Sequence, residues 1–173
     1  MGRSNVGKSS LINVLARQTI ARTSAAPGKT RLANYYEIDS GLQTPGSGHF
    51  YLVDLPGYGY ARGGEESVRT FEQLTAQYFA IEPGSPRRIA GVLHLIDSRH
   101  PDLEADLDAH RWLAGATLPV AIIATKIDKL TQSEKAGALR TLDEQYDAAV
   151  LPISSLKGSG VNAVWKVIRE WLR

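Results

Sequence analysis

A glycine-rich segment at the start of the chain constrains the possible folds more than any other feature. From Gly2 to Ser9 it matches the pattern G-x-x-x-x-G-K-[ST] in full. In this pattern, glycines let successive backbone N–H groups curl around phosphates, and the helix that follows adds the positive end of its dipole. We therefore predict a phosphate-binding loop, in preference to a simple glycine-containing turn before a helix. The residues assigned to it are Gly2, Arg3, Ser4, Asn5, Val6, Gly7, Lys8, Ser9 and Ser10.

Lys8 and Ser9 are expected to have separate roles in this loop. The Lys8 ammonium reaches the β- and γ-phosphates in such a loop, so we assign it to catalysis as well as to binding. The Ser9 hydroxyl can ligate Mg²⁺.

Strand-like and helix-like segments alternate along the chain, which is typical of an α/β domain. The strand-like segments are Ala33 to Asp39, Phe50 to Asp54, Gly91 to Asp97, Val120 to Thr125 and Ala149 to Ile153. The helix-like segments are Lys8 to Arg17, Glu65 to Ala80, Asp102 to Leu113, Gln132 to Asp147 and Val161 to Leu172. The third and fourth strands read almost continuously apolar, which predicts a mostly parallel, doubly wound sheet. The first two strands flank a turn-rich segment from Ser40 to Gly48, so we predict an antiparallel edge hairpin there.

The N-terminus departs from the usual arrangement of such a loop. A phosphate loop normally follows a central strand, yet only Met1 precedes Gly2. We expect that the first strand is missing from this chain.

A second motif indicates which base is bound. Thr125, Lys126, Ile127 and Asp128 follow an apolar strand and form a variant of the guanine motif N-K-x-D. The Asp128 carboxylate can accept hydrogen bonds from both guanine donors, whereas adenine would leave it unpaired. The alternative is a surface helix entry capped by the aspartate. Together with the phosphate loop, the motif predicts a P-loop NTPase fold of the Ras-like GTPase type.

Three further segments are candidates for nucleotide contacts. Ile153, Ser154 and Ser155 suit a loop whose N–H groups face guanine O6, although alone they indicate only a turn. In Asp54, Leu55, Pro56 and Gly57, the carboxylate can reach Mg²⁺ through water and the Gly57 N–H can donate to the γ-phosphate. In Pro27, Gly28, Lys29 and Thr30, the threonine is the candidate that closes over Mg²⁺. Gly57 and Thr30 are therefore assigned to catalysis together with Lys8.

With these motifs in place, the chain closely resembles the EngB family of bacterial GTP-binding proteins, over nearly its whole length. The most specific segments are Gly2 to Asn13, Pro27 to Thr30, Asp54 to Ala61, which reads DLPGYGYA, and Thr125 to Leu130. Thr125 is that family's own variant of the guanine motif. Ala26 stands where the family usually has Thr.

The resemblance implies one GTPase domain over residues 1–173 and a switch function in assembly of the large ribosomal subunit. It also implies a link to cell division and transient partners made of ribosomal RNA and ribosomal proteins. Basic residues near the presumed switches are candidates for meeting RNA phosphates, or else are an ordinary solvated mixture of charges. They are Arg22, Lys29, Arg31, Arg62 and Arg69.

Composition excludes several other classes of function. The chain has no cysteine, which removes disulfides, zinc–thiolate sites and thiol catalysis, and its four histidines lack metal-ligand spacing. No apolar run reaches the roughly 18 to 20 residues that span a bilayer. The net charge of +2 is too small to argue for nucleic-acid binding by itself. We expect a soluble, cytoplasmic protein with no membrane or DNA partner.

The residue after Gly57 bears on the rate of hydrolysis. Tyr58 stands where many GTPases place a glutamine that orients water, so intrinsic hydrolysis should be slow. Asn5 is a possible ligand of K⁺, which would offset charge in the transition state, or else a brace of the loop. Two other functions stay open, a GTPase domain in another RNA task such as tRNA modification and a nucleotide-binding module without hydrolysis.

Overall fold

The computed structural model describes residues 1–22, 32–41, 48–58, 73, 75–80, 85 and 87–173. Strands and helices alternate in the order α1 (Lys8–Ala16), β1 (Asn34–Asp39), β2 (His49–Asp54), β3 (Val92–Asp97), α3 (Glu104–Ala114), β4 (Val120–Thr125), the short 3₁₀ helix η2 (Ile127–Lys129), α4 (Gln132–Gln145), β5 (Ala149–Pro152) and α5 (Val161–Trp171). Residues 73 and 75–79 are also helical, inside the segment 65–80 predicted as a helix, most of which lies outside the described residues. The predicted alternation is confirmed, with element ends shifted by one or two residues.

The described strands form two sheets. In the three-stranded sheet, β4 lies between β3 and β5 and pairs in parallel with both, with Val92 opposite Val120 and Ala121 opposite Ala149. In the two-stranded sheet, β1 and β2 pair antiparallel with Asn34 opposite Asp54. The predicted α/β fold with a parallel sheet and an antiparallel pair is therefore confirmed.

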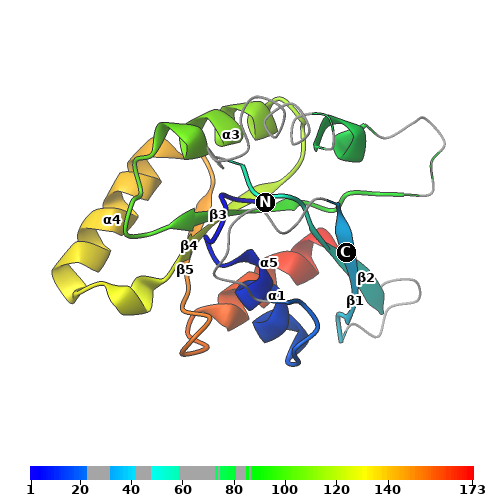
Figure 1. Ribbon diagram of the computed structural model, residues 1–173, viewed down its shortest axis with the longest axis horizontal. Coiled ribbons are helices and arrows are strands. Elements are labelled where there is room, and N and C mark those ends of the chain that lie inside the picture. Colours follow the sequence, from blue (N-terminus) through cyan, green and yellow to red (C-terminus); the bar gives the residue numbers. More distant parts are fainter. Residues whose placement is uncertain (23–31, 42–47, 59–72, 74, 81–84, 86) are drawn as a thin grey trace.

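Helices cover both faces of the parallel sheet. Figure 1 shows α3 and α4 on one side of β3, β4 and β5, and α1 and α5 on the other. Neighbouring residues of β4 serve opposite faces, because side chains alternate along a strand. Ile123 packs with Leu15 of α1 and Trp165 of α5, whereas Ile122 packs with Leu142 of α4. Burial on both faces explains why this strand is apolar throughout.

The first two residues lie along the outer edge of β3. The Met1 ammonium donates to the Leu93 carbonyl at 2.8 Å, and the Leu95 N–H donates to the Met1 carbonyl at 2.8 Å. Gly2 forms a parallel bridge with Leu95. A cavity of about 500 Å³ lies beside this edge and is lined by Met1, by side chains of β2 and β3 and by Trp171 of α5. The phosphate loop therefore begins beside the outer edge of β3.

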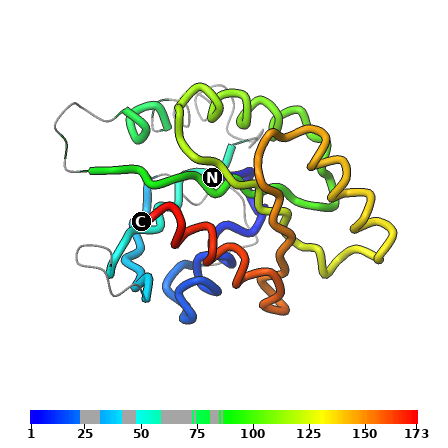
Figure 2. Tube along the Cα trace, turned by 180° about the vertical axis from the view of Figure 1, so that it is seen from behind, coloured from blue at the N-terminus to red at the C-terminus, as the bar shows by residue number. Residues whose placement is uncertain are grey.

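The C-terminal helix α5 lies on the same side of the sheet as α1. Figure 2, which views the molecule from behind, shows α5 running beside α1 with the C-terminus near β1 and β2. Within the described part of the chain, no helix combines the length and apolar character needed to cross a membrane.

Candidate nucleotide-binding site

The predicted phosphate loop turns sharply into α1. Asn5 and Gly7 both have positive φ angles, 61° and 113°, and at Gly7 the angle favours a residue without a side chain. Lys8 begins the helix, and its Nζ donates to the carbonyls of Gly2 and Arg3, each at 3.1 Å. Ser9 and Ser10 follow in the first turn, which contains no acidic residue. The helix N-terminus therefore offers N–H groups and positive charge to an anion.

Asp54 ends β2 beside this loop. Its Oδ1 atom is buried and has no hydrogen-bond partner among the residues that the structure describes. Burial raises the pKa of Asp54, while the nearby Lys8 ammonium opposes that shift. Burial likewise lowers the pKa of Lys8, and Asp54 opposes it. A buried carboxylate oxygen without a partner, together with the Ser9 hydroxyl at the head of α1, fits the oxygen ligands that Mg²⁺ prefers.

Gly57 lies against the phosphate loop after the buried residues Leu55 and Pro56. A Cβ atom at this position would stand 2.7 Å from the Ser4 nitrogen and 2.8 Å from Lys8 Nζ. Only glycine permits such a close approach without displacing the loop. The segment predicted to sense the γ-phosphate therefore touches the groups predicted to bind it.

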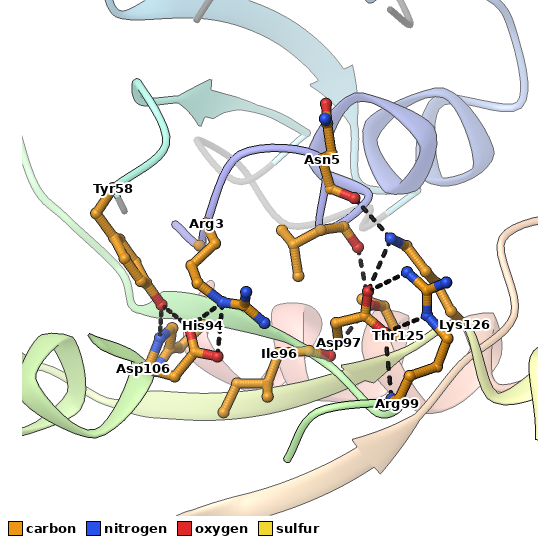
Figure 3. A network of polar contacts seen from close by, with 12 residues as sticks. Arg3, Asn5, Tyr58, His94, Ile96, Asp97, Arg99, Asp106, Thr125 and Lys126 are labelled. Atoms are coloured by element: carbon orange, nitrogen blue, oxygen red, sulfur yellow. Dashed lines mark hydrogen bonds and ion pairs between the residues drawn. The ribbon is translucent and has the colours of Figure 1, made fainter. Parts of the chain in front are cut away.

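The base-binding motif is tied to the phosphate loop through Thr125 and Lys126. The buried Thr125 hydroxyl lies 2.8 Å from the Val6 carbonyl and 3.0 Å from the Ile96 carbonyl. Lys126 Nζ donates to the Asn5 carbonyl at 2.7 Å and to Asp97 Oδ2 at 2.8 Å. Figure 3 shows these contacts converging, while the Asn5 side chain points away from Lys126. One polar network therefore joins the two predicted motifs.

Asp97 is the last residue of β3, and its carboxylate accepts hydrogen bonds from both Lys126 and Arg99. Arg99 donates to its two carboxylate oxygens at 2.9 Å and 2.7 Å. Burial alone would raise the pKa of Asp97, but the hydrogen bonds from Arg99 and Lys126 outweigh it and hold the pKa well below its usual range. Asp97 was not among the predicted site residues. Its signal was the position of a carboxylate directly after an apolar parallel strand.

Asp128 lines a separate pocket of about 200 Å³ together with Ile127, Ser154 and Lys157. Its Oδ1 atom accepts a hydrogen bond from the Ser154 hydroxyl at 2.6 Å. That bond lowers the pKa of Asp128, and burial acts in the opposite direction. The carboxylate therefore stays ionised at neutral pH.

The segment after β5 completes this pocket. The Ile127 N–H donates to the Ile153 carbonyl at 3.3 Å, which joins the base motif to this segment. The Ser154 hydroxyl also accepts from the Lys157 N–H at 3.1 Å, and Ser155 follows in the same turn. The structure thus brings together the segments expected at the base.

A second polar cluster lies beneath the phosphate loop. Arg3 Nε donates to both carboxylate oxygens of Asp106 on α3, at 3.1 Å and 2.9 Å. The Tyr58 hydroxyl donates to Asp106 at 2.7 Å and lies 2.6 Å from His94 Nε2. Sequence reasoning missed Asp106, because an aspartate in the first turn of a helix is ordinary.

The predicted switch residues Pro27, Gly28, Lys29 and Thr30 lie outside the described residues. The same holds for Gly59, Tyr60 and Ala61, which end the DLPGYGYA segment, and for Arg31, Arg62 and Arg69. The remaining predicted site residues all belong to the phosphate loop, the end of β2, the end of β4 or the turn after β5.

Comparisons with known proteins agree with this geometry. Residues 1–126 match the family described as 50S ribosome-binding GTPase. The chain is 44% identical over 163 residues to a probable GTP-binding protein EngB of Chlorobaculum tepidum, which covers 92% of this chain and 79% of that protein. It is 40% identical over 174 residues to a probable GTP-binding protein EngB of Solibacter usitatus, with 100% and 84% covered.

Solved structures establish the fold. A crystal structure of a probable GTP-binding protein EngB superposes with a TM-score of 0.71 at 20% identity and covers 99% of this chain and 96% of that one. Era of Aquifex aeolicus bound to GDP and AlF₄⁻ gives a TM-score of 0.80 at 21% identity, with 99% and 55% covered. The predicted P-loop GTPase fold is confirmed. The family match, the identity to these relatives and the shared fold show that the chain belongs to the EngB family of GTP-binding proteins.

Proposed function

We propose that Asp128 selects guanine in the pocket beside η2. The main support for this proposal is that the Asp128 side chain lines that pocket. Its carboxylate is ionised, 6% exposed and held by Ser154. Two acceptor oxygens match the two adjacent donors on the guanine edge, whereas adenine presents a ring acceptor in that place. GTP and GDP are therefore the ligands that this pocket favours.

Replacing Asp128 tests this assignment. Asp128→Asn removes the charge and turns one acceptor into a donor, so the GDP dissociation constant should rise more than tenfold, corresponding to about 1.5 to 3 kcal/mol. The matched control is Asp143→Asn, the same change on the exposed face of α4, which should leave the affinity for GDP unaltered. Unchanged affinity in Asp128→Asn would refute the assignment.

We also propose roles at the phosphates for residues of the phosphate loop and of the switch segments. The residues of the phosphate loop bind the phosphate chain, and Lys8 stabilises the charge that develops on the γ-phosphate. Ser9 and Thr30 would hold Mg²⁺ directly and Asp54 through water. The metal, when bound, neutralises phosphate charge in the transition state. Pro27, Gly28 and Lys29 complete the proposed switch.

Slow hydrolysis is proposed because the residue after Gly57 cannot orient water. The Tyr58 side chain is buried, with its hydroxyl at Asp106 and His94. An aromatic ring held in this way offers no amide to an attacking water. We propose K⁺ at Asn5 as one means of supplying the missing charge. The Asn5 side chain is exposed at the loop surface, which is compatible with that role.

The biological role that we propose is a GTP-dependent switch in assembly of the large ribosomal subunit, in the cytoplasm and needed for normal cell division. Support comes from the description of the matched family as 50S ribosome-binding GTPase and from the relatives named EngB. We further propose that residues 1–173 act as one GTPase domain whose transient partners are precursor ribosomal RNA and ribosomal proteins.

Co-sedimentation tests this role. The protein bound to a non-hydrolysable GTP analogue should travel with large-subunit precursors in a density gradient, and the GDP-bound protein should not. Depletion of the protein should cause large-subunit precursors to accumulate and division septa to be lost. If the GTP-analogue form sediments with neither ribosomal subunit, the role falls and another RNA task, such as tRNA modification, gains weight.

A further inference from the structure

Tyr58 is linked to the phosphate loop directly through its backbone and indirectly through its side chain. Its carbonyl accepts a hydrogen bond from the Ser4 N–H at 3.3 Å. Its hydroxyl donates at 2.7 Å to Asp106, whose carboxylate also holds Arg3 of the same loop. Tyr58 is therefore linked to the loop twice, directly through its carbonyl and indirectly through Asp106 of α3.

The charges in this buried cluster are balanced. Burial and the neighbouring Asp106 raise the pKa of Tyr58, so its hydroxyl keeps the proton that it donates. Burial lowers the pKa of His94 to about 3, so the ring is neutral and its Nε2–H can donate to the Tyr58 oxygen. Burial raises the pKa of Asp106, while the hydrogen bond from Tyr58 and the Arg3 guanidinium oppose that shift. A buried ion pair of this kind is stabilised when hydrogen bonds satisfy its remaining lone pairs.

These contacts hold Gly57 against Lys8, the residue proposed to bind the γ-phosphate. A single added carbon atom on Gly57 would already lie 2.8 Å from Lys8 Nζ. Lys8 meanwhile donates to carbonyls of its own loop, and the Ser4 N–H is engaged by Tyr58. A phosphate oxygen that binds Lys8 on this side must therefore displace Gly57, whereas a diphosphate lacks the group that would collide.

We propose that Tyr58 and Asp106 form a latch that holds Gly57 against the phosphate loop and so favours GDP over GTP. The latch consists of the hydrogen bond between these two side chains and the Arg3 ion pair that anchors Asp106 to the loop. Asp106 is a positioning residue, since it acts on the γ-phosphate site through Arg3 and Tyr58. Because GTP must open the latch and GDP need not, GTP shifts the equilibrium toward the open latch. This proposal rests on the proposed nucleotide site.

Tyr58→Phe tests the latch, because it deletes one hydroxyl and keeps the ring. The measurement is the ratio of the dissociation constants for GDP and for a non-hydrolysable GTP analogue, both with Mg²⁺. Loss of one hydrogen bond of ordinary strength should shift this ratio toward the GTP analogue about threefold to tenfold. A purely structural role for Tyr58 would weaken both nucleotides equally and leave the ratio as it is.

Tyr146→Phe provides the matched control in the same cluster. The Tyr146 ring lies edge-on to the His94 and His110 rings, at 6.2 Å and 4.9 Å between centroids. Its buried hydroxyl has no hydrogen-bond partner within the part of the chain that the structure describes. This variant should therefore keep the wild-type ratio, and thermal unfolding shows whether both variants are folded.

The outcomes separate the latch from the nucleotide site itself. A ratio shifted toward the GTP analogue in Tyr58→Phe, and unshifted in Tyr146→Phe, supports the latch. An unshifted ratio in Tyr58→Phe, or a shift toward GDP, overturns it while the wild type still binds both nucleotides. If the wild type binds neither nucleotide, the proposed nucleotide site itself is refuted. Asp106→Ala removes the acceptor of the Tyr58 hydroxyl and the ion pair with Arg3, so it breaks the latch from the other side and should shift the ratio in the same direction.

Discussion

Thr125→Val is the substitution for which the structure allows the most detailed prediction. Valine has nearly the shape of threonine, so the change removes the hydroxyl and leaves little cavity. The hydroxyl lies within hydrogen-bond distance of two carbonyls, those of Val6 and Ile96, in a site where Thr125 is 3% exposed. Leaving a buried acceptor without its donor costs about 1 to 3 kcal/mol. Burying an extra methyl group returns up to about 0.8 kcal/mol.

The net expectation is a loss of roughly 0.2 to 2 kcal/mol in the free energy of unfolding. Because Val6 belongs to the phosphate loop, the GDP dissociation constant should also rise, by about threefold to tenfold. Denaturant unfolding followed by tryptophan fluorescence measures the first quantity, and calorimetric titration with GDP measures the second.

Thr141→Val is the matched control for this prediction. The Thr141 hydroxyl donates to the Gly137 carbonyl of its own helix, α4, at 3.2 Å, and within the described residues this side chain makes no hydrogen bond to the phosphate loop. It should leave GDP affinity at the wild-type value. If Thr125→Val loses less than about 0.2 kcal/mol and binds GDP normally, the reasoning about the bridge between the two motifs is refuted.

Three further predictions follow from the site. Gly57→Ala should weaken GDP binding about tenfold, since its methyl group would collide with the Ser4 nitrogen and Lys8 Nζ and displace the phosphate loop; wild-type affinity for GDP would contradict the close approach. The pKa of His94 lies near 3 in the folded chain and near 6.5 when unfolded, so the unfolded state binds the extra proton and stability should fall as pH drops from about 6.5 toward 3. The slope attributable to His94, about 1 kcal/mol per pH unit, should disappear in His94→Gln, and equal slopes in both proteins would argue against a buried neutral ring. Hydrolysis should be faster in KCl than in NaCl and Asn5→Ala should remove the difference, whereas equal rates would leave Asn5 a brace of the loop.

Much of the fold and of the site could be predicted because the motifs are local. The run from Gly2 to Lys8 specifies a turn and a helix start by itself, and the apolar strand ending at Thr125 specifies its own burial on both faces. Since the carboxyl ends of parallel strands share one edge, motifs at those ends had to meet. Within the described residues, however, no complete strand precedes the phosphate loop, and the loop is placed beside β3 by the Gly2–Leu95 bridge, which the sequence did not indicate.

The contacts that join these motifs could not be predicted in the same way. Arg3 and Asp106 lie far apart in the chain, and neither the residue types nor their spacing indicate that one side chain reaches the other. Tyr58 was read only as a missing glutamine, whereas the structure shows its hydroxyl engaged with Asp106 and His94. Such pairings depend on how α3 packs over the loop, which is a property of the tertiary structure.

Direct titration of the chain with GDP and with ADP, each with Mg²⁺, tests the central claim most closely. The Asp128 carboxylate should make GDP bind at least roughly tenfold more tightly than ADP, because adenine leaves it without its two donors. The account predicts saturable binding of GDP with that preference. Equal affinity for the two nucleotides would contradict it.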